Sequence, residues 1–131
     1  MVKYWLISFL LIFVQTASAH SPLTSLIPKN GAILDRSPQR IEMSFEAPVK
    51  LIKLEMQKLT SDVANSSVSS FFSNVEAAAI LLGEGFLMNK SDQHSIDLPS
   101  LDNGTYQVKW RALGEDGHVI KGIFSFKVMG K

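Results

Sequence analysis

The chain has 131 residues, with 13 Lys and Arg against 12 Asp and Glu, and it contains no cysteine. A formal net charge of +1 without a basic cluster argues against a nucleic-acid-binding protein. Without cysteine the chain cannot form a disulfide framework, a Cys-based zinc site or a blue-copper centre. Any metal site must therefore use His, carboxylate, Met or free amine ligands.

The first 19 residues have the layout of a cleavable secretory signal. Lys3 provides a positive charge, residues 6–14 are apolar except for Ser8, and residues 15–19 end in Ala-x-Ala. The apolar stretch is too short to span a bilayer of roughly 30 Å, so we expect no stable membrane insertion after cleavage.

Cleavage after Ala19 leaves one domain, residues 20–131, with 112 residues and His20 as the new N-terminus. A domain of this size can bury a core without disulfides. Loss of the signal also removes one Lys, so the formal net charge falls from +1 to zero. We expect this mature domain to be a periplasmic monomer.

Four segments alternate apolar and polar residues with the period of two that is typical of half-buried β-strands. They are residues 41–46, 52–57, 106–112 and 123–128. Turn sequences separate them, namely Pro28-Lys29-Asn30-Gly31, Ser37-Pro38 and Asp102-Asn103-Gly104. This pattern predicts an all-β protein, either a β-sandwich or a small barrel.

Residues 61–85 do not follow the strand pattern. Residues 61–70 are polar, Ser73 and Glu76 fit a capping box, and the apolar run 77–82 ends at a glycine, as a short helix often does. A buried strand is the alternative. The sequence slightly favours a short helical or irregular insertion.

An N-terminal His20 offers a metal two nitrogens from one residue, the free α-amine and ring Nδ1. The amine has an ordinary pKa of roughly 8, so it loses its proton to a strong Lewis acid at small cost near neutral pH. Copper(II) prefers tetragonal sites of nitrogen and oxygen and leads the divalent affinity order. His20 is therefore a candidate copper(II) ligand.

Asp116 and His118 are two residues apart, so their side chains leave the same face if the segment is extended. One carboxylate and one imidazole would complete a square of three nitrogens and one oxygen around one copper(II) ion. The alternative is a solvated loop, because Asp-Gly is also a common hairpin turn. The two candidate sites strengthen each other because their ligand types are complementary.

The remaining histidine and the methionines suggest no second site. His94 follows the polar residues 91–93 and is interpreted first as a surface residue and second as an accessory ligand. Met43 and Met56 fall on inward faces of predicted strands, and the other methionines of the mature domain are isolated, so no copper(I) thioether cluster is supported.

Several segments of the mature chain match a known family in order. They are His20, Pro28–Ala32, Phe45–Val49, Leu101–Gly104, Tyr106–Arg111, Asp116–His118 and Gly122–Val128. In these segments the sequence resembles the CopC/PcoC-type periplasmic copper-resistance proteins. The C-terminal block is the most specific part, whereas residues 61–90 depart from the family pattern and Gly114 stands where Ser is usual.

The resemblance implies an immunoglobulin-like Greek-key β-sandwich or barrel with copper(II) at one end. The ligands that it implies are His20, through its amine and Nδ1, Asp116 and His118, with Glu46 at most outside the ligand shell. The methionine-rich copper(I) loop of some members is missing, so the chain looks like the copper(II)-only branch. The function implied is a non-enzymatic carrier or sequestering protein that hands copper to a membrane transporter or an export system.

Two other functions remain as alternatives. An N-terminal His chelate with a second His is also the copper site of polysaccharide mono-oxygenases, although an anionic Asp116 would disfavour the reduced state that oxygen chemistry needs. The domain could instead be a plain immunoglobulin-like interaction module. Hydrolytic catalysis fits less well than either, because no nucleophile–base spacing is evident.

Overall fold

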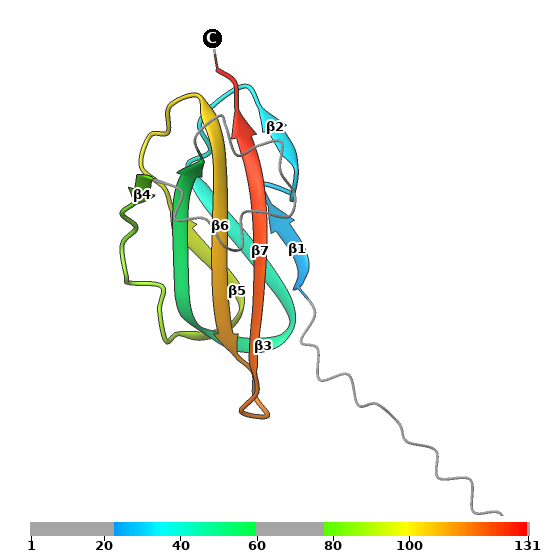
Figure 1. The fold of residues 1–131 in the computed structure, drawn as a ribbon. Helices are drawn as coiled ribbons and strands as arrows, with labels where there is room; N and C mark the ends of the chain where they lie inside the picture. The colour runs from blue at the N-terminus through cyan, green and yellow to red at the C-terminus, as the bar shows by residue number, and fades with distance from the viewer. Residues whose placement is uncertain (1–22, 60–77, 131) are drawn as a thin grey trace, which may run out of the picture.

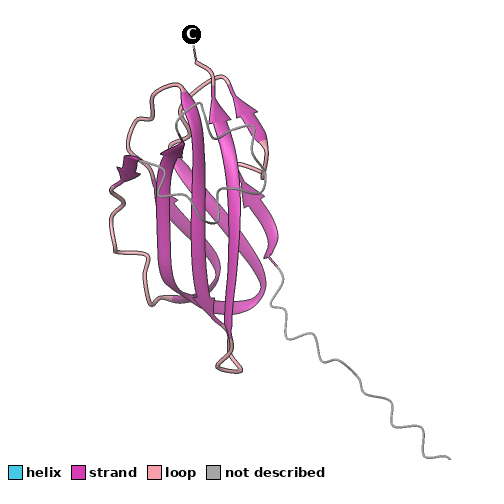
Figure 2. Cartoon of the chain, viewed as in Figure 1, coloured by secondary structure: helices cyan, strands magenta, loops and turns pink. Residues whose placement is uncertain are grey.

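Seven β-strands make up the computed structural model, which describes residues 23–59 and 78–130 (Figures 1 and 2). The strands are β1 (Leu23–Ile27), β2 (Ala32–Leu34), β3 (Arg40–Leu59), β4 (Ala78–Ile80), β5 (Lys90–Asp97), β6 (Gly104–Leu113) and β7 (Val119–Val128). No helix occurs within the described residues, so the predicted all-β class is confirmed there.

The strands form one curled sheet in the order β1-β3-β6-β7-β2, with β4 and β5 also paired to β3. Neighbouring strands are antiparallel except β2, which runs parallel to β7. The β6–β7 hairpin forms the tip of the molecule opposite the C-terminus, and β3 bends at this same end (Figure 1). In the described part of the chain, nothing forms a helix that could cross a membrane.

The two strands predicted at 41–46 and 52–57 are halves of the single strand β3. Its pairing with β5 shifts register between Ser44 and Val49, around Pro48. Proline has no N–H to donate to a sheet and is therefore tolerated at such irregularities. The bend lets the first half of β3 pair with β1 and β5 while the second half pairs with β6 and β4.

A second register shift in β3, between Leu51 and Lys53, changes which side chain points inward. Leu51 is fully buried, whereas Ile52, which alternation alone places on the inner face, is only half-buried. A bulge adds one residue to one strand, so the period of two restarts beyond it.

The inner face of the curled sheet holds a single apolar core. It comprises Ile41, Met43, Phe45, Val49, Leu51, Leu54, Met56, Ile96, Leu101, Tyr106, Val108, Trp110, Ala112, Phe124, Phe126 and Val128. Apart from Ile52, every residue that alternation placed inward in the four predicted strands is in this core. Two aromatic pairs lie within it: Tyr106 stacks on Phe126 at 5.7 Å, and Phe45 meets Trp110 edge-on at 5.5 Å.

Over residues 78–85 the predicted helical or irregular insertion forms no helix. Ala78–Ile80 form strand β4, which pairs with the last part of β3 from Met56 to Lys58, and the rest of this stretch is turn or irregular. The free edge of β3 offers backbone partners, and pairing with it overrides the weak helix preference of alanine. Residues 61–77 lie outside the described residues.

Tyr106 links the core to the loop before β6 through its hydroxyl, which donates to the backbone oxygen of Asp102 at 2.7 Å. Burial raises the pKa of Tyr106 above 10.0, and the charge of Asp102 raises it further. Tyr106→Phe keeps the ring but removes the donor, so we expect a loss of about 1 kcal/mol in urea unfolding without a change in slope.

The same substitution should alter the alkaline limb of stability. Because folding raises the pKa of Tyr106, this group favours the folded state below pH 10, and that contribution is lost as the pH rises through the folded value. The Phe variant should therefore lose stability less steeply above about pH 10. Identical unfolding midpoints at pH 7 would contradict a stabilising role for the hydroxyl.

Candidate metal site

A tight turn at the β6–β7 tip presents Asp116 and His118 to solvent. The N–H of Gly117 donates to the oxygen of Gly114 at 3.1 Å, and the N–H of Gly114 donates to the oxygen of His118 at 2.9 Å. Gly117 has a φ of 82°, a left-handed conformation that favours glycine. The Asp-Gly pair is therefore a hairpin turn, as one interpretation of the sequence predicted.

The turn also brings the two candidate ligands into direct contact. Oδ1 of Asp116 accepts the backbone N–H of His118 at 3.0 Å, and Oδ2 lies 2.8 Å from His118 Nδ1. The side chains are 53% and 71% exposed, respectively. The hydrogen bond from the His118 ring, followed by the one from its backbone, lowers the pKa of Asp116 below its usual value. Asp116 is thus an ionised acceptor at neutral pH.

This contact assigns the two ring nitrogens of His118 to different roles. An ionised carboxylate can only accept, so Nδ1 carries a proton and donates it to Asp116. In the neutral ring Nε2 then holds the free lone pair that a metal requires. A carboxylate that orients a metal-binding imidazole in this way is a recurrent arrangement in metal sites.

The turn is tied to the neighbouring strand β5. Lys90 Nζ lies 2.9 Å from Glu115 Oε1, and both side chains are about half exposed. Such a surface ion pair contributes little to stability. Its geometric effect is to link the tip to the bend of β3, because Lys90 pairs with Lys50 and Lys50 pairs with Leu113 at the end of β6.

The first described residue, Leu23, lies towards the same end of the barrel. β1 is antiparallel to the first half of β3, and Leu23 pairs with Phe45, just before the bend. Glu46 follows Phe45 and is exposed. Within the described residues no three His, Asp or Glu side chains gather closely enough to hold a metal, so Glu46 does not join Asp116 and His118. His20 lies outside the described residues.

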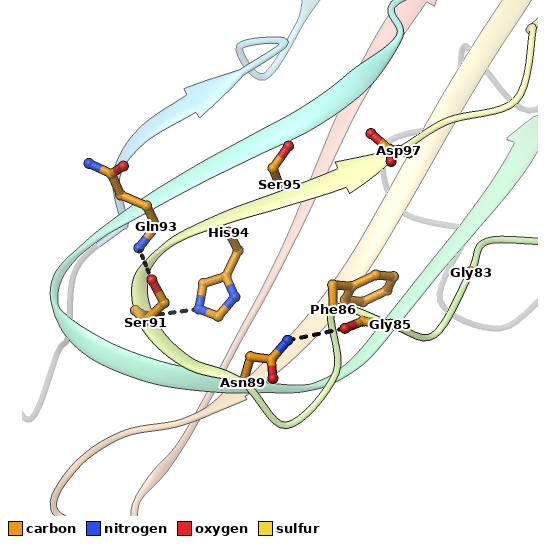
Figure 3. Close-up of a pocket in the computed structure, with 9 residues that line it drawn as sticks. All are labelled: Gly83, Gly85, Phe86, Asn89, Ser91, Gln93, His94, Ser95 and Asp97. Atoms are coloured by element: carbon orange, nitrogen blue, oxygen red, sulfur yellow. Dashed lines mark hydrogen bonds between the residues drawn. The ribbon is translucent and has the colours of Figure 1, made fainter.

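His94 is not the surface residue that the sequence suggested. It is 6% exposed, and its Nε2 lies 2.8 Å from the oxygen of Ser91 (Figure 3). The same nitrogen lies 3.1 Å from the oxygen of Val49. Carbonyl oxygens only accept, so Nε2 is protonated and cannot ligate a metal while these bonds exist. The ring also meets Phe45 edge-on at 5.9 Å.

This role of His94 had a detectable signal in the sequence. His94 and Ile96 are buried while Gln93, Ser95 and Asp97 are exposed, which is the period of two expected of a strand. The polar character of the segment concealed this pattern. His94 therefore packs between β3 and β5, and its role differs from that of the exposed Asp116–His118 pair at the tip.

Comparison with known proteins agrees with this architecture. The family model of the CopC domain matches residues 23–129. Copper resistance protein C of Escherichia coli is 29% identical over 113 residues, which cover 86% of this chain and 84% of that protein. Protein YobA of Escherichia coli strain K12 is 28% identical over 113 residues, which cover 84% of this chain and 79% of that protein.

Solved structures show the same fold. CopC from Methylosinus trichosporium OB3b superposes with a TM-score of 0.58 at 23% identity, covering 85% of this chain and 95% of that one. PcoC, a methionine-rich copper resistance protein from Escherichia coli, gives a TM-score of 0.58 at 21% identity, covering 85% and 100%. The expected Greek-key β-barrel or sandwich is thereby confirmed, and the chain belongs to the CopC family.

Proposed function

We propose that this protein binds one copper(II) ion at the tip of the barrel and carries or sequesters it in the periplasm. The observation that supports this most strongly is the Asp116–His118 pair, in which the carboxylate holds the imidazole and leaves Nε2 available. The relative named Copper resistance protein C supports copper as the cargo. Imidazole nitrogen and carboxylate oxygen are the ligand types that copper(II) prefers.

The proposed second half of the ligand set is His20, through its α-amine and Nδ1 after cleavage behind Ala19. Leu23 lies at the bend end of β1, and three extended residues span at most about 10 Å. An extended segment of this length would bring His20 towards the end of the barrel that carries the hairpin. Together with His118 and Asp116 it would supply three nitrogens and one oxygen.

Asp116 can act in two ways in this set. Each of its oxygens accepts one hydrogen bond from His118 and keeps a second lone pair. Asp116 would ligate copper directly if the His118 ring rotated away from it, and the exposure of both side chains permits that rotation. Otherwise it remains the group that orients His118.

An exposed site at a tip suits transfer of the ion more than catalysis. No residue from 113 to 120 is buried, and Asp116 and His118 are exposed, so an incoming partner can reach the copper ligands directly. We propose a monomeric, non-enzymatic carrier that hands copper to a membrane transporter or an export system.

Substitution of the pair tests the proposal. His118→Ala removes a direct ligand and should lower copper(II) affinity of the mature protein by more than about 100-fold in isothermal titration. Asp116→Ala should cost about 10- to 100-fold if the carboxylate only orients His118, and more if it ligates.

Glu115→Gln is the matched control, because it alters the neighbouring carboxylate and its bond to Lys90 but leaves the pair intact. It should bind copper(II) as the unaltered protein does. Copper(II) EPR should show nitrogen-rich tetragonal coupling that weakens in His118→Ala only. Unchanged affinity in His118→Ala would refute the site.

A further inference from the structure

Three cations form a row across the outer face of the sheet beside the metal hairpin. Lys53 on β3 pairs in register with Arg111 on β6, and Arg111 pairs with Lys121 on β7. All three are exposed. Since neighbouring strands lie about 4.8 Å apart, the row is roughly 10 Å long. Lys109, also exposed, lies next to it in the following outward position of β6.

The row has little neutralising charge. Glu55 contacts Lys53 at 3.0 Å and pairs in register with Lys109, whereas Arg111 and Lys121 form no ion pair with any other described residue. Like charges directly opposite one another on adjacent strands destabilise a sheet. The arrangement therefore does not serve folding, and an external anion would relieve the repulsion.

Apolar side chains flank the row on β7. Val119 and Ile123 stand on either side of Lys121 on the outward face and are 55% and 52% exposed. A depression lies over the row, lined by the four cations together with Glu55, Trp110, Gly122 and Ile123. Exposed cations with apolar neighbours around a depression are typical of a protein-binding surface.

The row lies close to the proposed copper ligands. Arg111 is three residues before the turn at Gly114, and Lys121 is three residues after His118. About 10 Å of strand therefore separates the row from the hairpin turn. A partner that covered the row would therefore stand beside the metal hairpin.

We propose that this basic face, defined by Lys53, Lys109, Arg111 and Lys121, docks an acidic segment of the protein that exchanges copper with the hairpin. This proposal rests on the proposed copper-binding function, because the docked protein would exchange copper with the hairpin. Its test needs no copper. An acidic peptide fits better than a lipid surface, because the exposed large apolar residues of the described chain include no aromatic side chain of the kind that anchors proteins at membranes.

The test uses the copper-free mature protein and a fluorescein-labelled decapeptide of alternating Glu and Ser. Fluorescence anisotropy should detect binding at low ionic strength that weakens strongly at 0.15 M salt. Arg111→Glu/Lys121→Glu should weaken binding by roughly tenfold or more. Lys29→Glu/Arg36→Glu changes the net charge equally at exposed positions outside this face, and it should bind as the unaltered protein does.

The Tm of a single variant shows whether the cations of the basic face are needed for folding or for binding. Arg111→Glu places an anion between Lys53 and Lys121, so its Tm should rise by roughly 1 to 4 °C although it binds the peptide less well. Equal loss of binding in both double variants would overturn the proposal, as would binding to phosphatidylglycerol vesicles but not to the peptide. Because no copper is present, neither result depends on whether the hairpin binds the metal.

Discussion

An extension of four residues in front of His20 is expected to remove most of the copper(II) affinity of this protein. The proposed chelate needs the free α-amine and Nδ1 of the same residue. An added residue converts that amine into an amide, which no longer offers a basic lone pair to the metal. The remaining ligands, Asp116 and His118, sit in contact at an exposed tip and cannot supply a chelate of similar strength. Loss of a residue that only orients a metal ligand lowers affinity by roughly 10- to 100-fold. Loss of a direct ligand should cost more, so we expect the copper(II) affinity to fall by at least about 100-fold.

The measurement compares mature protein that starts at His20 with the same protein carrying Ser-Gly-Ser-Gly before it, because a single added glycine would place its own amine where it can chelate copper(II) together with the His20 imidazole. Isothermal titration gives the affinity, and copper(II) EPR gives the number of coupled nitrogens, which should fall in the extended protein. A protein with the same four residues after Lys131 is the matched control, since β7 ends at the opposite end of the barrel from the hairpin (Figure 1). Equal affinity of the two extended proteins would refute the amine chelate.

Local patterns in the sequence predicted most of the strands because one face of the sheet lies against the apolar core and the other face lies against water. Inward residues such as Val108 and Phe126 are fully buried, and their neighbours Lys109 and Lys127 are exposed, so the alternation is readable along the chain. The bulge near Leu51 could not be predicted in this way, because it depends on the register with another strand.

Strand β4 shows a different limit of sequence reasoning. Ala78 and Ala79 carry a weak helix preference, but their conformation is decided by the edge of β3, twenty or more residues earlier in the chain. No window around residue 78 contains that information. Pairing between distant segments is a tertiary property, and propensity gives way to it.

The candidate site was predictable in composition but not in geometry. Spacing alone placed Asp116 and His118 on one face of an extended segment, whereas the structure holds them together by a turn at Gly117. The division of roles between Nδ1 and Nε2 follows only from that contact. His94 illustrates the converse case, since a histidine in a polar segment is buried by pairing of β5 with β3.

Gly122, which the sequence marked only as part of a family-like segment, should prove essential for packing. It pairs in register with Trp110, and a Cβ at this position would lie 2.7 Å from three atoms of the buried indole. The indole cannot retreat freely, because it meets Phe45 edge-on at 5.5 Å. Gly122→Ala should therefore lower the free energy of unfolding by about 1 to 3 kcal/mol, the usual range for an overpacked core. Gly122→Val should cost more.

A double-mutant cycle with Trp110→Phe tests whether the indole is the cause. Trp110→Phe alone leaves space in the core and should destabilise, but the methyl of Gly122→Ala then has room, so the double variant should be more stable than the sum of the single effects by about 1 kcal/mol. Gly83→Ala is the control, since a Cβ there meets nothing within 4 Å, and it should leave the Tm nearly unchanged. Additive losses in the cycle would show that the strand backbone, and not the contact with Trp110, requires glycine. If the losses are not additive, as we expect, the requirement for glycine at position 122 comes from contact with the indole of Trp110, because the two residues share one layer of the core.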